Sequence, residues 1–220
     1  MKKEKPSDYY DQLFDSRNDY QVHYRQSYYY VHWTQVIRFL EWFDEPKILE
    51  IGCGTGQLAE YIYAEGFKFY TGFDFSPKAI EMAKTKVRFP FFIENALNPK
   101  AFEVDYDTVI CLEVLEHIKE DLKVIKNIKD GTRIIFSLPN FDDPSHVRFF
   151  RSERSIKARY YKLIDIKKII RIGQIYICLG IKEPFKPNLA QWLFKTRERT
   201  GLGSFTRRVI FRINNIIKSS

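Results

Sequence analysis

The chain has 220 residues, of which 45% are hydrophobic and 16% aromatic, so it can bury one sizeable core but hardly two full domains. Its formal net charge of +8 suits a nucleic acid, an anionic membrane surface or a phosphorylated substrate, and does not choose among them. The three cysteines stand singly in apolar stretches and no stretch could span a bilayer, which argues against a disulfide framework, a cysteine-ligated zinc site and a membrane-spanning helix.

Residues 1–45 are predicted to form a helical cap that is rich in aromatic side chains. A stripe of apolar residues recurs there at helical spacing: Trp33, Ile37, Leu40 and Phe43. We expect this stripe to pack on a sheet. Tyr9, Tyr24 or Arg25 could close over a ligand site or contact a substrate.

Residues 46–184 alternate between β-rich apolar runs and helical patterns, which is typical of a parallel sheet. The first five predicted strands cover residues 47–51, 69–73, 91–93, 108–112 and 133–138. Predicted helices cover residues 57–66, a segment capped by Ser76, residues 116–128 and residues 152–162. Two further strands are joined at Gly173 as an antiparallel pair. The predicted fold is therefore an α/β, Rossmann-like three-layer sandwich, with a seven-stranded, mostly parallel sheet that ends in an antiparallel hairpin.

Residues 185–220 form a basic tail, in which eight Lys and Arg side chains stand against Glu198 alone. Phe205, Val209 and Ile213 fall on one helical face, which predicts a basic amphipathic helix. Such a helix could lie on an anionic membrane, contact RNA phosphates, or dock its apolar face on the protein's own core.

Three glycines at alternate positions follow the first predicted strand in the run ILEIGCGTGQL. Gly52 and Gly54 would let the backbone approach a ligand closely, and Gly56 would let the next helix pack near the strand. A dinucleotide site reads GxGxxG, but Gln57 stands where its last glycine would be. The spacing from Glu50 to Gly56 instead resembles the first motif of the class I S-adenosylmethionine-dependent methyltransferases.

Two later segments extend this resemblance. GFDFSPKAIEMAK resembles the second segment of the family, which implies that the carboxylate of Asp74 accepts both ribose hydroxyls and that Phe75 lies beside the adenine. IENAL resembles the next segment, with Asn95 in the place of an aspartate that receives the adenine amino group, followed by Ala96. Because an amide carries no charge, this contact is expected to be weaker than that of the aspartate.

The run DTVICLEVLEH resembles a segment of the quinone-biosynthesis O-methyltransferases and of many small-molecule relatives. The resemblance implies that Leu112 and Glu113 line the methionine end of the cofactor. His117 follows the strand directly, and His146 follows the next strand, so both should reach the cofactor side of the sheet. We predict these two histidines as the catalytic residues, with His117 as the general base.

The same segment, with the later histidine, also resembles a ligand set for a divalent metal. Small-RNA 2′-O-methyltransferases hold such an ion with a similar ExxEH and a later histidine, and Glu113, Glu116, His117 and His146 form an equivalent set here. Glu113 and Glu116 point apart if a helix begins between them. The predicted site therefore includes no metal.

The predicted function is S-adenosylmethionine-dependent methyl transfer to a small-molecule or glycan- or lipid-linked acceptor, with a hydroxyl as the methylated group. Two alternatives stay open: an RNA methyltransferase, and a protein that binds S-adenosylmethionine without catalysis. RNA is less favoured because the predicted core carries mixed charges. We expect a cytoplasmic protein that contacts the anionic inner face of the membrane through its tail.

Overall fold

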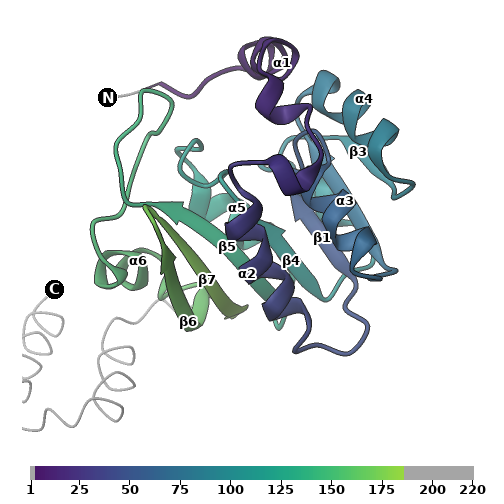
Figure 1. The fold of residues 1–220 in the computed structure, drawn as a ribbon. Coiled ribbons are helices and arrows are strands. Elements are labelled where there is room, and N and C mark those ends of the chain that lie inside the picture. The colour runs from purple at the N-terminus through teal and green to yellow at the C-terminus, as the bar shows by residue number, and fades with distance from the viewer. Residues whose placement is uncertain (1–2, 186–220) are drawn as a thin grey trace, which may run out of the picture. The chain divides into compact units, whose positions relative to one another are not determined.

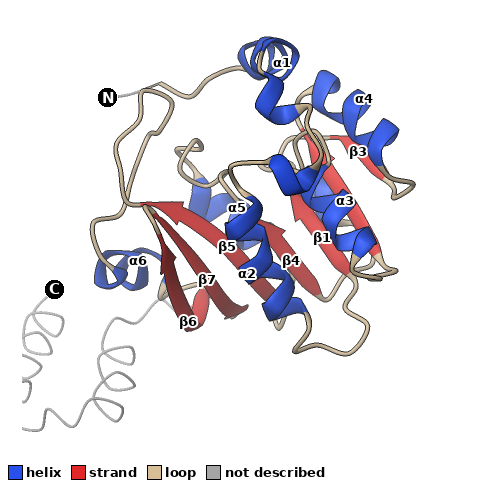
Figure 2. Cartoon of the chain, viewed as in Figure 1, coloured by secondary structure: helices blue, strands red, loops and turns tan. Residues whose placement is uncertain are grey.

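The computed structural model describes residues 3–185, which contain a single sheet of seven strands. The strand order is β3-β2-β1-β4-β5-β7-β6, and Figure 2 shows the strands side by side as one twisted sheet. Residues 1–184 form one compact unit. The predicted basic helix of the tail lies outside the described residues.

The strands lie close to the predicted runs. Their bounds are Ile48–Ile51 (β1), Tyr70–Asp74 (β2), Phe91–Ile93 (β3), Thr108–Cys111 (β4), Arg133–Pro139 (β5), Ile164–Ile172 (β6) and Ile175–Lys182 (β7). The first five pair in parallel, whereas β7 pairs with β5 and β6 in antiparallel fashion. The predicted fold class, with its antiparallel last hairpin, is thus confirmed.

Helices cover both faces of the sheet because successive strand residues point to opposite sides. Ile134 and Phe136 of β5 belong to one core, while Ile135 belongs to the other. The first core is shared with α5 (Asp121–Asn127) and α6 (Glu153–Tyr160). The second is shared with α2 (Tyr30–Leu40), α3 (Gln57–Ala64) and α4 (Pro77–Lys86), and Figure 1 shows α2 and α3 on the viewer's side of the sheet.

The apolar stripe of the amino-terminal segment packs as expected. Trp33, Ile37 and Leu40 of α2 are buried in the second core, where the helix lies against β7. An earlier helix, α1, covers Ser7–Ser16 and lies beside α4. Short 3-10 turns stand at Asn18–Tyr20, Tyr24–Gln26 and Pro99–Phe102. Within residues 3–185, no helix is both long enough and apolar enough to cross a membrane.

The predicted helix over residues 116–128 is shorter in the structure, since α5 begins only at Asp121. The guanidinium of Arg148 explains this difference, because it donates to the carbonyl oxygens of Leu115, Ile118 and Lys119. These hydrogen bonds hold residues 115–119 in turns rather than in a helix. The residues between β4 and α5 therefore form a loop, which shapes the site described below.

Gly56 adopts a left-handed backbone with φ of +77° at the start of α3, and a Cβ there would lie 2.9 Å from Ala83 of α4. The predicted close packing is real, but the neighbour is a helix rather than the strand. We expect Gly56→Ala to lower the free energy of unfolding by about 2 kcal/mol, because the backbone strain and the steric clash add.

Gly66 offers a matched control, because its φ is +85° but no atom lies within 4 Å of a Cβ there. Gly66→Ala should cost about 1 kcal/mol, the backbone term alone. Chemical denaturation of both variants measures the difference, and equal losses would show that contact with Ala83 contributes nothing.

Candidate active site

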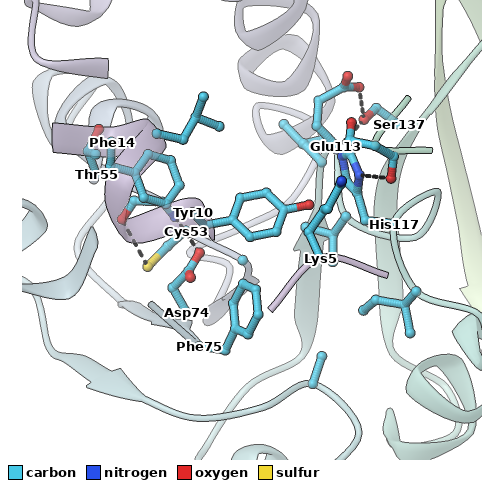
Figure 3. A pocket seen from close by; sticks show the side chains of 18 of the residues that line it. Lys5, Tyr10, Phe14, Cys53, Thr55, Asp74, Phe75, Glu113, His117 and Ser137 are labelled. Carbon is cyan, nitrogen blue, oxygen red and sulfur yellow. Dashed lines mark hydrogen bonds between the residues drawn. The ribbon is translucent and has the colours of Figure 1, made fainter. Parts of the chain in front are cut away.

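A pocket of about 810 Å³ opens at the carboxyl ends of β1, β2 and β4. The sheet extends from β1 toward β2 on one side and toward β4 on the other, which creates the crevice where open α/β sheets bind ligands. Figure 3 shows Tyr10 and Phe14 of α1 and the preceding Lys5 over this pocket, opposite Asp74 and Glu113. The pocket therefore lies between the sheet edge and the amino-terminal segment.

The glycine loop forms one wall of the pocket. Gly54 lies in the left-handed region, and a Cβ there would have only the ring of Phe14, 4.0 Å away, as a neighbour. Gly54 lines the pocket, and the close approach of a ligand to its backbone remains a prediction. A Cβ on Gly52 would instead lie 2.4 Å from the Val114 side chain, so packing against the loop after β4 already requires that glycine.

Asp74, at the end of β2, is buried beside the glycine loop. Its Oδ2 accepts the N–H of Gly54 at 3.0 Å, and its Oδ1 accepts the N–H of Ser76 at 2.9 Å. Burial raises the pKa of Asp74 to about 6, although these hydrogen bonds oppose the rise. Each oxygen keeps a further lone pair, so the carboxylate can also accept hydroxyl groups of a ligand.

Glu50 lies in β1 beneath the same loop and is almost fully buried. The hydroxyl of Tyr70 donates to its Oε2. Burial raises the pKa of Glu50 to about 8, so this residue is largely neutral at pH 7. Its role as a support for the loop remains a prediction.

The residues predicted to contact the adenine all line the pocket. Phe75 lies with its ring centroid 5.3 Å from that of Tyr10. Asn95 is exposed and its Oδ1 accepts the N–H of Leu97 at 2.9 Å, while Ala96 is buried. The adenine contact of Asn95 remains a prediction, and it must share the amide oxygen with this turn.

The loop after β4 carries Leu112 and Glu113, which both line the pocket. Glu113 has a positive φ of 55°, which is uncommon for a non-glycine residue and indicates strain at a site. Ser137 of β5 holds it in place: its Oγ accepts the N–H of Glu113 at 2.7 Å and donates to Oε1 at 2.6 Å. Burial, followed by the charge of Glu116, raises the pKa of Glu113 to about 8.

Glu116, His117 and His146 come together, with one ligand atom of each residue within 4.8 Å of the others. Nδ1 of His117 lies within hydrogen-bond distance of the Ser145 carbonyl oxygen, at 3.1 Å. Nδ1 of His146 lies 3.4 Å from the Phe141 carbonyl oxygen. When these nitrogens donate, Nε2 of each ring is the basic nitrogen. Burial lowers the pKa of His117, so its imidazole is neutral near pH 7. The structure thus unites both predicted catalytic histidines.

The same cluster suits a divalent cation. Glu116 is fully buried, and neither of its carboxylate oxygens has a hydrogen-bond partner on another described residue. Burial raises the pKa of Glu116 to about 8, which reflects the cost of an uncompensated buried charge. One carboxylate oxygen and two imidazole nitrogens form a common ligand set for such an ion. Glu113, which the sequence grouped with these residues, is not in this cluster.

Arg148 holds this cluster together and was not predicted from the sequence. Besides the three carbonyls of the loop after β4, its guanidinium lies 3.3 Å from the carboxylate of Asp121. Asp121 is fully buried and also accepts from Arg159 at 2.5 and 2.7 Å and from the Tyr160 hydroxyl at 2.8 Å. The backbone N–H of Val147 donates to the Glu116 carbonyl at 2.8 Å. The loop that carries His117 is therefore fixed to the segment that carries His146.

The three amino-terminal residues proposed to close the site are separated in the structure. Tyr9 lines the pocket. Tyr24 is buried elsewhere and stacks on Tyr61 of α3 at 4.7 Å, and Arg25 lies over the Tyr24 ring. Neither Tyr24 nor Arg25 lines the pocket, so the expectation for these two residues was wrong. The Tyr24 ring packs on α3 instead.

Comparison with known families gives a match over most of the chain. Residues 22–172 match the family described as "Methyltransferase domain". The chain is 30% identical over 139 residues to the ubiquinone biosynthesis O-methyltransferase of Vibrio vulnificus, which covers 57% of this chain and 52% of that protein. It is 32% identical over 136 residues to the protein of the same name from Vibrio campbellii, with the same coverage. The chain spans about half the length of the curated relatives it matches.

Solved structures share the fold. Magnesium protoporphyrin IX methyltransferase from Synechocystis, solved with S-adenosylhomocysteine, superimposes with a TM-score of 0.61 at 22% identity, covering 80% of this chain and 98% of that chain. The N-methyltransferase NodS from Bradyrhizobium japonicum, also with S-adenosylhomocysteine, gives a TM-score of 0.56 at 19% identity, covering 77% and 90%. At these sequence identities, the similarity shows a shared fold and nothing further.

Proposed function

Since the chain belongs to the methyltransferase domain family and is a class I S-adenosylmethionine-dependent methyltransferase, we propose that it methylates a hydroxyl oxygen. The acceptor is a small molecule or a glycan- or lipid-linked group. The observation that carries this proposal is one pocket that joins the Asp74 carboxylate to the rings of His117 and His146. The cofactor would lie along the carboxyl ends of β1, β2 and β4, with its sugar at Asp74 and its methionine end at Glu113.

The pocket wall beyond the glycine loop supports a neutral acceptor with a flat or apolar face. This wall is formed by Tyr29, Trp33, Phe141, Ile175 and Ile177, which come from α2, β7 and the loop after β5. Aromatic faces of this kind stack on rings and on the apolar faces of sugars. The relatives named for ubiquinone biosynthesis are O-methyltransferases, which favours oxygen as the methylated atom.

The transfer needs little from the protein beyond position and one base. The acceptor oxygen attacks the methyl carbon in line with sulfur, the carbon–sulfur bond breaks, and the positive sulfonium becomes a neutral thioether. The proton of the acceptor hydroxyl passes to Nε2 of His117, which burial keeps neutral and therefore basic. A divalent cation held by Glu116 and the two histidines would be the alternative to this base: it would use the same Nε2 lone pair of His117 and would lower the pKa of the acceptor hydroxyl instead.

The test is to incubate the protein with methyl-labelled S-adenosylmethionine and fractionated cell extract. Label in lipid, polysaccharide or small-molecule fractions, as a methyl ether, supports the proposal. Label in RNA alone would overturn it in favour of the RNA methyltransferase. Calorimetric binding of the cofactor without label in any fraction would identify the non-catalytic binding protein instead.

We expect added Mn²⁺ to raise the thermal midpoint of metal-stripped protein more at pH 8 than at pH 6. The ion must displace the proton of Glu116, and a pKa of about 8 means that this carboxyl is mostly protonated at pH 6. Thermal scans with and without Mn²⁺ measure the shift. The shift should vanish in Glu116→Gln; if that variant responds like the wild type, the ion binds elsewhere.

A further inference from the structure

The helix α1 is attached firmly to the wall of the pocket. Asp11 accepts hydrogen bonds from the Ser76 hydroxyl and from the N–H of Lys78 at 3.2 Å, both at the start of α4. The Lys78 ammonium pairs with Asp15 one turn further along α1, at 3.0 Å. These contacts fix the orientation of Tyr10, which directly precedes Asp11.

The ring of Tyr10 bridges the two halves of the pocket. Its centroid lies 5.3 Å from the ring of Phe75 on the predicted adenine side and 6.0 Å from the ring of His117 on the catalytic side. Figure 3 shows the ring across the pocket, with its hydroxyl directed toward the end that holds Glu113 and His117. Tyr10 thus lies between the predicted adenine side and the predicted catalytic side of the pocket.

The hydroxyl of Tyr10 is buried and has no hydrogen-bond partner among the described residues. A buried hydroxyl without a partner is unfavourable, and native proteins keep few of them outside functional sites. Burial, followed by the charge of Glu116, raises the pKa of Tyr10 well above its usual value. Because a phenol ordinarily loses its proton only near pH 10, Tyr10 is neutral at neutral pH and can donate a hydrogen bond.

We propose that the Tyr10 hydroxyl donates a hydrogen bond to the acceptor oxygen that receives the methyl group. This inference rests on the proposed function and adds a specificity residue to it. The acceptor oxygen would accept from Tyr10 with one lone pair and attack the methyl carbon with the other, while its own proton passes to His117. Tyr10 keeps its proton throughout, so it positions the acceptor rather than serving as an acid or a base.

The test compares Tyr10→Phe with wild type and with Tyr63→Phe, which removes the same group from an exposed side chain of α3 that does not line the pocket. The kinetic probe is the extract fraction that the wild type labels, and the binding probe is S-adenosylhomocysteine. We expect Tyr10→Phe to lower kcat/KM for the acceptor about tenfold, mainly through KM, with the Kd of S-adenosylhomocysteine within twofold. Tyr63→Phe should leave all these values within twofold.

Stability separates this role from a structural one. Loss of an unpartnered buried hydroxyl should leave the thermal midpoint of the free protein unchanged or raise it. A lower midpoint, an unchanged kcat/KM, or an equal loss of affinity for S-adenosylhomocysteine would each overturn the proposal. A wild type that labels no fraction would instead refute the proposed function itself.

Discussion

Replacement of Glu116 by glutamine is expected to lower kcat by at least about 10- to 100-fold, because it removes the carboxylate that would hold the divalent cation. Its carboxylate is buried beside the two histidines, and neither of its oxygens accepts a hydrogen bond from another described residue. Cofactor affinity should change less than twofold, because Glu116 is not among the residues that line the pocket. Single-turnover rates with saturating labelled cofactor measure the first effect, and calorimetry measures the second.

The same substitution should change how stability depends on pH. The pKa of Glu116 is about 8 in the folded protein against 4.5 as its ordinary value, so the folded state binds this proton more tightly. The resulting stability is complete below pH 4.5 and is lost as the pH rises through 8. Glu116→Gln cannot ionise, so it should unfold at a higher temperature than wild type at pH 8.5 and at a similar temperature at pH 4.5.

A suitable control is Glu120→Gln, because Glu120 is exposed and only 3.9 Å from Lys123 in a surface ion pair. This variant should follow the wild type in turnover and in the pH dependence of stability. If Glu116→Gln loses stability with rising pH as steeply as Glu120→Gln, ionisation of Glu116 does not cost the folded state anything. Full turnover in Glu116→Gln would remove the residue from the reaction.

Much of the fold was predictable because local patterns and tertiary packing agree. The runs that became β1 and β4 are mostly apolar and are buried on both sides, as strands covered by helices are, and Ser76 with Pro77 marks the start of α4 unambiguously. The start of α5 was not predictable, because Arg148 donates hydrogen bonds to three carbonyl oxygens just before the helix and holds that stretch as a loop. That residue lies some thirty positions away, and no local pattern in the sequence points to it.

The candidate site shows the same division. Asp74 and the glycines were recognisable because short motifs place them at strand ends, where parallel strands share one edge of the sheet. The pairing of His117 with His146 followed from the same rule. Tyr10 was one of many aromatic residues in the first forty-five, and only the docking of α1 on α4 distinguishes it from Tyr24.

Replacement of Asp74 by alanine is expected to weaken binding of S-adenosylmethionine by about 1–3 kcal/mol, the scale of lost charge-assisted hydrogen bonds. Two effects add in this variant. The ribose hydroxyls would lose their acceptor, and the N–H groups of Gly54 and Ser76 would lose the carboxylate that holds the two loops together. Asp74→Asn keeps the shape but offers one acceptor oxygen instead of two, so its loss should be smaller.

The pH dependence of binding identifies which effect dominates. The pKa of Asp74 is about 6 in the free protein, so wild-type affinity for the cofactor should increase between pH 5 and pH 7 as the carboxylate forms. Asp74→Asn has no such group and should bind with nearly constant affinity over this range. Ser76→Ala is the control for loop order, since it removes the cap on Ala79 and the hydrogen bond to Asp11 of α1 but leaves the Asp74 carboxylate in place. Isothermal titration calorimetry at both pH values decides the matter: unchanged affinity in Asp74→Ala, or an equal pH dependence in Asp74→Asn, would remove Asp74 from the cofactor site.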